Sequence, residues 1–204
     1  FVYTAAISSG IPASRVLVDG PIVLPQLTGH DWRPANFGEE FQGPMTLREG
    51  LYRSINMIAI KLGWEEVGIE TVAQTARRMG IQTEIERFPS TTIGAAEVIP
   101  LEIAEAYSAF PNMGIKVRPF PILRVEDAAG NSLWEPQPER TQVLDSLSAR
   151  IMVSMLEDVV IRGTGYTAIR IRAGLPFSIP AAGKTGTTND GTDVWFNGFT
   201  PTLQ

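Results

Sequence analysis

The stretch that decides the fold is Ala181-Ala182-Gly183-Lys184-Thr185-Gly186-Thr187-Thr188. It is nearly free of bulky side chains and holds one of the three lysines of the chain. A tight-turn signal, Asn189-Asp190-Gly191, comes next, and residues 193–199 are aromatic and rich in β-forming residues. This order predicts a β-hairpin in which the first strand carries Lys184 and the second strand returns from the turn.

The side chains of the predicted first strand suit a negatively charged ligand. Lys184 supplies a positive charge, and Thr185 and Thr187 supply hydroxyl groups on one face, because side chains two residues apart on a strand share a face. Gly183 and Gly186 leave the backbone bare, so that a ligand or another chain can approach it closely. A carboxylate would fit this set of groups. The same residues also occur in an ordinary exposed strand, and the segment alone leaves both interpretations open.

Two kinds of protein use a string like this one. A P-loop ends in Gly-Lys-Thr, as Gly183-Lys184-Thr185 does, but it needs a glycine five residues before Gly183, where Ser178 stands. It also needs a helix after Thr185, where a turn and a strand are predicted, so the P-loop is excluded. The other use is the Lys-Thr-Gly element of penicillin-binding proteins and serine β-lactamases, which accompanies a Ser-x-x-Lys and a Ser-x-Asn.

The composition is that of one globular domain. The 204 residues are 44% hydrophobic and 19% charged, which allows a sizeable core. The net charge of −5 argues against a nucleic-acid partner, and no apolar run is long enough to span a membrane. The chain has no cysteine and a single histidine, His30, in a loop-like stretch. It therefore predicts no metal site, no cofactor and no Ser-His-Asp triad.

Hydrophobic periodicity and turn residues predict an alternation of helices and short strands. Thr46 and Glu49 form a capping box, so a helix is expected to begin there; its apolar stripe continues to Leu62, and Gly63 ends it. The expected elements are a helix at 1–7, a strand at 15–19, a loop at 25–44, helices at 46–62, 70–79 and 101–110, a hairpin at 116–135, a helix at 146–162, an irregular stretch at 166–180 and the final hairpin.

A second candidate motif, Ser54-Ile55-Asn56, lies inside the helix predicted at 46–62. By pattern, Ser54 and Asn56 point away from the core, and solvated polar side chains on a helix would be enough to explain them. The functional interpretation is favoured because Lys-Thr-Gly follows Ser-Ile-Asn in the sequence, which is the order that the penicillin-recognising enzymes use.

The chain resembles the transpeptidase domain of class A, bifunctional penicillin-binding proteins over nearly all of its 204 residues. Besides the two motifs, the matching segments are 1–7, 15–21, 32–36, 43–51, 94–101, 104–107, 182–190 and 195–201. The resemblance implies an α/β fold of the α+β type, in which helices flank an antiparallel sheet and the last hairpin supplies central strands. It also implies a short break between two helices at Ser-x-Asn. We expect this break rather than the continuous helix that the apolar stripe indicates.

The resemblance further implies a peptidoglycan D,D-transpeptidase that works through a serine acyl-enzyme and is inhibited by β-lactams. Its partners would be stem peptides ending in D-Ala-D-Ala and the β-lactam antibiotics that imitate them. By the same resemblance, Ser54 passes a proton to the leaving amine. Asn56 holds the lysine of the nucleophile motif and the substrate backbone. Lys184 keeps the pocket positive and hydrogen-bonds Ser54.

The resemblance assigns substrate binding to the strand that carries Lys184. Thr185 and Thr187 would hold the terminal carboxylate of the donor, and the backbone N–H of Thr187 would supply half of the oxyanion hole. Gly186 would leave room for the donor peptide to lie against the strand.

The family's nucleophile motif, Ser-x-x-Lys, is absent from the sequence. The residues three positions before the lysines are Ile58, Met113 and Ala181. We expect residues 1–204 to be a partial transpeptidase domain that lacks the N-terminal nucleophile segment and the C-terminal end. The parent would be anchored by other segments at the periplasmic face of the bacterial inner membrane. The alternatives are a D,D-carboxypeptidase or β-lactamase-like hydrolase, against which the landmarks around Trp32 and Tyr107 argue, and a non-catalytic remnant that only binds partners.

Overall fold

The computed structural model describes residues 1–25, 29, 31–188 and 191–203. His30 and two residues of the predicted hairpin turn, Asn189 and Asp190, lie outside the described residues. The elements in chain order are α1 (Val2–Ser8), β1 (Val16–Asp19), β2 (Gly43–Thr46), α2 (Leu47–Tyr52), α3 (Asn56–Ile60), the π-helix η1 (Lys61–Glu66), α4 (Ile69–Met79), the 3₁₀-helix η2 (Pro89–Ile93), α5 (Pro100–Tyr107), β3 (Ile115–Val117), β4 (Val125–Glu126), β5 (Ser132–Trp134), β6 (Arg140–Gln142), α6 (Ser146–Ile161), the π-helix η3 (Thr167–Arg172), β7 (Ala182–Thr187) and β8 (Val194–Phe199).

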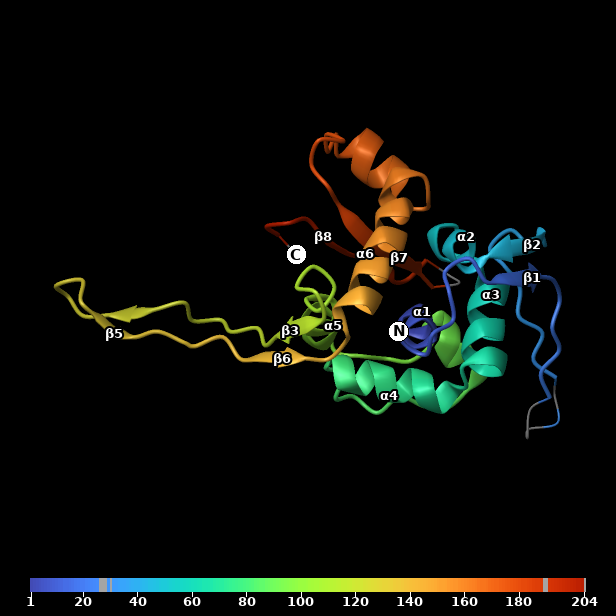
Figure 1. Cartoon of the computed structure of the whole chain (residues 1–204), viewed down its shortest axis with the longest axis horizontal. Helices are drawn as coiled ribbons and strands as arrows, with labels where there is room; N and C mark the ends of the chain where they lie inside the picture. Colours follow the sequence, from blue (N-terminus) through green and yellow to red (C-terminus); the bar gives the residue numbers. More distant parts are fainter. Residues whose placement is uncertain (26–28, 30, 189–190, 204) are drawn as a thin grey trace.

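Helix α6 is the centre of the fold. It begins where predicted, because the side chain of Asp145 accepts a hydrogen bond from the N–H of Ser148 and so caps the helix. Helices α1 and α2 and strand β7 all pack against it (Figure 1). Beyond α2 lie α3, β1 and β2, and on the opposite side of the molecule the strands β3 to β6 form a long projecting arm (Figure 1).

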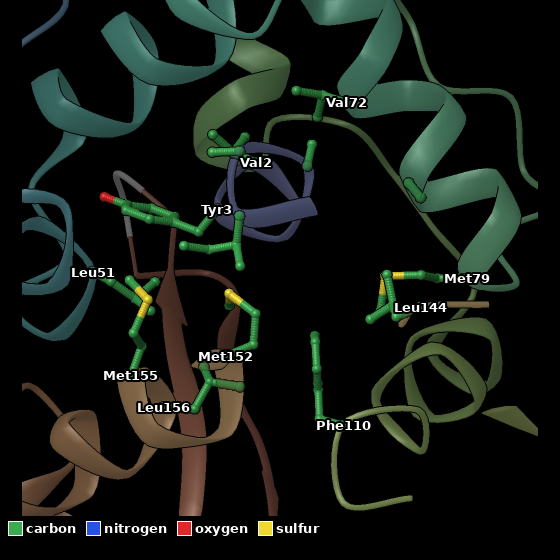
Figure 2. Close-up of a cluster of buried hydrophobic side chains, with 14 of the residues drawn as sticks. Val2, Tyr3, Leu51, Val72, Met79, Phe110, Leu144, Met152, Met155 and Leu156 are labelled. Atoms are coloured by element: carbon green, nitrogen blue, oxygen red, sulfur yellow. The ribbon is translucent and has the colours of Figure 1, made fainter. Parts of the chain in front are cut away.

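The hydrophobic core lies where α6 meets the other helices. Figure 2 shows the side chains that gather there: Val2 and Tyr3 of α1, Leu51 of α2, Val72 and Met79 of α4, Met152, Met155 and Leu156 of α6, and Phe110 and Leu144 from the connecting segments. Each buried side chain of this size stabilises the fold by about 1.5–3 kcal/mol. This packing fixes α1 and α2 relative to α6, and therefore fixes the segments that bear the candidate site.

The final hairpin confirms the prediction made from the Lys184 stretch. Strands β7 and β8 pair antiparallel, with Lys184 opposite Asn197 and Gly186 opposite Trp195. Helix α6 packs against β7 and α5 against β8, so the predicted α+β arrangement of antiparallel strands and flanking helices is confirmed. In the part of the chain that the structure describes, β7 and β8 pair only with each other. Their central place in a larger sheet stays a prediction.

The helix predicted at 46–62 is interrupted, as the family resemblance implied and the apolar stripe did not. Its beginning is confirmed, since Thr46 Oγ1 accepts from the N–H of Glu49 at 3.1 Å. The chain then leaves the helical conformation after Tyr52 and re-enters it at Asn56.

The prediction that Gly63 ends this helical region is wrong. The π-helix η1 runs through Gly63, and its hydrogen bonds close a wider turn, as between Val67 N and Leu62 O (2.9 Å). A Cβ on Gly63 would lie 2.8 Å from Thr92 Cγ2. Glycine is needed here because η2 packs closely against η1, and no local pattern contains that information.

Three further differences concern short elements. Residues 166–180 are not wholly irregular, because they contain η3. The hairpin predicted at 116–135 is present but shorter, since β4 and β5 pair only around Val125 and Trp134. The pairing of β3 with β6 and of β1 with β2 was not predicted. These strands are only three or four residues long, which is too short for hydrophobic periodicity to indicate how they pair.

Candidate active site

Ser54 lies at the break between α2 and α3 with a left-handed backbone, at φ 57°. The N–H of Ser54 donates to Leu51 O at 3.1 Å, and the N–H of Ile55 donates to Gly50 O at 2.9 Å. This pair of bonds is the Schellman arrangement, whose left-handed position usually holds glycine because a side chain there costs about 1–2 kcal/mol. Strained residues of this kind cluster at functional sites, so the strain supports a functional role for Ser54.

The strain at Ser54 predicts that glycine is a more stable replacement than alanine at this position. We expect Ser54→Gly to be more stable than Ser54→Ala by about 1 kcal/mol, because both variants lose the hydroxyl but only alanine keeps the backbone strain. Chemical denaturation of the two variants measures the difference. Equal free energies of unfolding would mean that the backbone at Ser54 is not strained.

Lys184 joins the two predicted motifs directly. Its Nζ donates to Ser54 Oγ at 2.7 Å and to Thr185 O at 2.8 Å, so residues 130 positions apart in the sequence meet at one point. Burial lowers the pKa of Lys184 to about 8, because the surrounding protein solvates the cation less well than water does. The pair therefore combines a hydroxyl that can both donate and accept with a lysine poised near physiological pH.

Asn56 stands two residues after Ser54, but its side chain bonds to a different part of the structure. Its side-chain Nδ2 donates to Ala35 O at 2.9 Å, which ties the first residue of α3 to the segment between β1 and β2. The structure thus brings Ser54 and Lys184 together and joins Asn56 to the segment between β1 and β2.

Thr185 contacts a residue that the sequence interpretation did not include among the site residues. Its Oγ1 lies 2.6 Å from Thr164 Oγ1, in the turn that follows α6. Thr164 is held in turn by its N–H, which donates to Tyr52 O at 3.1 Å, so this turn is fixed to the end of α2. The signal in the sequence was Gly163-Thr164-Gly165, which was used only as the end of a helix. Thr187 is exposed and is the last residue of β7.

A charged cluster fixes the turn that carries Thr164 relative to α2. Asp158 Oδ2 accepts from Arg48 at 3.0 Å and from Arg162 at 2.6 Å, and the Arg162 guanidinium lies 5.0 Å from the centre of the Tyr52 ring. Burial acts to raise the pKa of Asp158, but the hydrogen bonds and charges of Arg162 and Arg48 outweigh it and hold the pKa below its usual value. The cluster thus stays charged at neutral pH and clamps α6 to α2.

The two glycines of β7 differ in what the fold requires of them. A Cβ on Gly183 would lie 2.6 Å from Asn197 O, so no side chain fits at that position. A Cβ on Gly186 would meet only Trp195 Cβ, at the ordinary contact distance of 3.4 Å. Packing within the fold therefore explains why residue 183 is a glycine but not why residue 186 is one. Close approach of a ligand to the strand would explain the glycine at 186.

Two other kinds of site are absent from the described ranges. Between residues 1 and 203, leaving out the undescribed positions, no group of three or more His, Cys, Asp and Glu side chains could hold a metal ion. None of the described helices combines the length and apolar character that a membrane span needs.

A family model described as "Penicillin binding protein transpeptidase domain" matches residues 1–204. The chain belongs to the penicillin-binding protein transpeptidase family. The resemblance inferred from the motifs is therefore confirmed.

Curated relatives agree with this assignment. The chain is 33% identical to penicillin-binding protein 1A of Pseudomonas aeruginosa, with 98% of this chain and 30% of the relative aligned. It is 38% identical to penicillin-binding protein 1A of Neisseria lactamica, with 98% of this chain and 25% of that protein aligned. The chain thus spans only a quarter to a third of the length of these relatives.

Solved structures of the family share the fold. Penicillin-binding protein 1A of Haemophilus influenzae superposes with a TM-score of 0.88 at 28% identity, over 97% of this chain and 34% of that one. Penicillin-binding protein 3 of Mycobacterium tuberculosis, complexed with aztreonam, superposes with a TM-score of 0.73 at 25% identity, over 98% of this chain and 51% of that one.

Proposed function

We propose that residues 1–204 supply the proton-relay and donor-binding parts of a peptidoglycan D,D-transpeptidase. The observation that supports this most strongly is the 2.7 Å contact between Lys184 Nζ and Ser54 Oγ, which unites the Ser-x-Asn and Lys-Thr-Gly motifs in one site. Family membership supports the acyl-transfer chemistry. The aztreonam complex of a related protein of the same fold supports binding of β-lactams.

The proposed reaction has two acyl transfers. The hydroxyl of a catalytic serine adds to the carbonyl carbon of the penultimate D-Ala, the C–N bond to the terminal D-Ala breaks, and an ester forms. The leaving amine takes up the proton that the serine hydroxyl loses, and Ser54 can pass it on because its hydroxyl accepts from one group while donating to another. The amine of a second stem peptide then attacks the ester, forms the cross-linking amide and releases the serine. Lys184 orients Ser54 and keeps the site positive.

Strand β7 is the proposed platform for the donor peptide. In the described chain, β8 pairs along one edge of β7 and no strand pairs along the other, so a peptide has room to add there. Gly186 favours this approach because packing alone does not require glycine at that position. Thr185 and Thr187 would donate to the terminal carboxylate of the donor, and the N–H of Thr187 would stabilise the oxyanion. Asn56 would hold the substrate backbone and the lysine of the nucleophile motif.

The remaining elements of the proposal come from the family. Residues 1–204 are one part of a transpeptidase domain, whose serine nucleophile belongs to a Ser-x-x-Lys motif outside them. The parent acts on stem peptides ending in D-Ala-D-Ala at the periplasmic face of the bacterial inner membrane.

Carboxylate recognition provides the test of the proposed function. In the parent protein, we expect Thr185→Val with Thr187→Val to slow acylation by donors with a free terminal carboxylate at least tenfold more than acylation by their amidated analogues. A lost hydrogen bond to a charged group is worth about 1.5–3 kcal/mol, which supports a difference of this size. Stopped-flow acylation kinetics measure both donors.

The matched control for this experiment is Thr141→Val, which makes the same change at an exposed position of β6 on the projecting arm. We expect it to leave both rates unchanged. An equal loss for the two donors in the Thr185/Thr187 variant would mean that the hydroxyls do not read the carboxylate, and the proposed donor site would be wrong.

A further inference from the structure

Helix α3 begins without a cap from its own residues. Its N-cap residue, Ile55, has no side-chain oxygen, so the first N–H groups of the helix need acceptors from elsewhere. One acceptor comes from a distant segment, because the N–H of Met57 donates to Asn36 Oδ1 at 3.2 Å. We propose that Asn36, held by Asp19, is a positioning residue that fixes the Ser54–Asn56 motif for catalysis. The two residues are called the Asp19–Asn36 clamp below, and their proposed role rests on the function proposed above.

Both N–H donors and the oxygen of the Asn36 side-chain amide take part in hydrogen bonds. Its Nδ2 donates to Asp19 Oδ1 at 2.8 Å and to Glu40 O at 2.9 Å, while its Oδ1 accepts from Met57. The other carboxylate oxygen of Asp19 accepts from the N–H of Gln42 at 2.9 Å. Asp19 is 1% exposed and Asn36 6% exposed, so each lost bond would leave a buried polar group unsatisfied. Only a side-chain amide offers two donors and one acceptor in this geometry.

The clamp acts on the part of α3 that bears the motif. Ala35, the neighbour of Asn36, accepts from Asn56 Nδ2, so two successive loop residues hold two successive helix residues. Beyond the end of α3, Lys61 Nζ donates to Val18 O at 2.8 Å, next to Asp19 in β1. The beginning of α3 and the residue after its end are therefore both attached to β1 and the segment that follows it.

The strained conformation of Ser54 explains why such a clamp is needed. A left-handed serine persists only when its surroundings over-determine it. On one side Tyr52 O accepts from Thr164 N, and on the other side the clamp fixes Met57, so the break is held from both ends. When the clamp loosens, we expect Ser54 Oγ to move away from Lys184 Nζ. A misplacement of about 1 Å can slow an enzyme by about 10²-fold.

The test uses Asn36→Asp and a charge swap in the full-length parent, with acylation by a fluorescent penicillin as the readout. Asn36→Asp removes both amide donors and sets two buried carboxylates against each other. We expect acylation at pH 7.5 to be slower than in the wild type by about 10²-fold. Two carboxylates that share a site raise the pKa of one of them, so the rate should rise again as the pH falls and the pair binds a proton.

The swap Asp19→Asn with Asn36→Asp restores one amide facing one carboxylate and keeps the acceptor for Met57, and it loses only the bond from residue 36 to Glu40 O. We expect it to acylate within about tenfold of the wild type, with no recovery at lower pH, because no second carboxylate remains to be protonated. Three other charged residues bond to the clamp or next to it: Glu39, whose N–H donates to Asn36 O, Glu40, whose carbonyl accepts from Asn36, and Lys61 on η1, which donates to Val18 O. All three are unchanged in every variant, so we assign a difference in pH dependence between the variants to the clamp.

Ser54→Ala is measured beside these variants to separate the two proposals. If Ser54→Ala slows acylation and Asn36→Asp does not, the clamp is refuted while the proposed function stands. If Ser54→Ala has no effect, the proposed function itself fails. If Asn36→Asp does not fold, the double variant Asp19→Asn with Asn36→Asp provides the test. A folded double variant that is acylated as slowly as Ser54→Ala would refute the proposed role of the clamp.

Hydrogen exchange of the unmodified protein tests the clamp without any substitution. N–H groups in the first turn of a helix have no acceptor within the helix and usually exchange fast. We expect the Met57 amide to exchange as slowly as the interior of α3, because Asn36 accepts its hydrogen bond. Fast exchange would refute the clamp even if none of the variants folds.

Discussion

Replacing Lys184 by alanine in the parent protein is expected to slow acylation by benzylpenicillin by about 10²–10⁴-fold, because the change removes a positioned group from the proton relay. The lysine donates to Ser54 Oγ at 2.7 Å, and no other side chain is described that donates to this hydroxyl. Ser54→Ala should cost about as much, and the double variant should be no slower than the slower single variant. Residues that act as a unit give this non-additive result.

The pH dependence of the same reaction follows from the pKa of Lys184. Burial lowers this pKa to about 8, so the lysine loses its proton at a lower pH than an exposed lysine would. We expect protonation of Lys184 not to limit the acylation rate below pH 8. Above pH 8 the rate should fall, because Lys184 loses its positive charge. Lys184→Arg should be slower but should lack this alkaline decline, because arginine stays protonated throughout.

The control for the lost charge is Arg124→Ala, which removes one positive charge from an exposed residue that directly precedes β4. The arm formed by β3 to β6 projects away from α2 and β7 (Figure 1). We expect wild-type acylation rates from Arg124→Ala. Near wild-type rates in both Lys184→Ala and Ser54→Ala would contradict the assignment of these residues to the relay.

The sequence predicted the contact between Ser54 and Lys184 better than it predicted the local structure around Ser54. Lys184 and Ser54 were assigned together because two motifs stand in the order that one family uses, and the structure joins their side chains. The apolar stripe, however, favoured a single helix through Ser54. Leu51 and Ile55 are buried on both sides of the break, because the Schellman turn folds Ile55 back onto the core. A break of this kind leaves the pattern of buried residues unchanged and is therefore invisible to periodicity.

The residues that the sequence did not reveal act through tertiary contacts. Gly163 has no side chain because a Cβ there would overlap the carbonyl oxygen of Tyr52, which is 111 positions earlier in the chain. This close approach is what brings Thr164 to Thr185. Asp19 and Asn36 lie in segments that matched the family, but their pairing is a buried contact between a strand end and a loop. Spacing along the chain gives no indication of such contacts.

The position of the nucleophilic serine can be tested by an experiment with an all-or-none outcome. No serine in the sequence stands three residues before a lysine, so residues 1–204 contain no Ser-x-x-Lys. The backbone nitrogen of Phe1 lies near enough to Lys184 for the charge of the lysine to act on it. The N-terminal end of α1 therefore lies close to Lys184. A segment joined to Phe1 would enter the site beside the relay, where a serine can be activated by a nearby base.

Mapping the penicilloyl adduct tests the central claim most directly. The full-length parent is incubated with benzylpenicillin and digested, and the modified peptide is identified by mass spectrometry, with Ser54→Ala and Lys184→Ala proteins treated in parallel. The account predicts one stoichiometric adduct, on a serine shortly before Phe1 that a lysine follows three positions later, and slow formation of the same adduct in both variants. An adduct on Ser54, or on any other serine of residues 1–204, would contradict it.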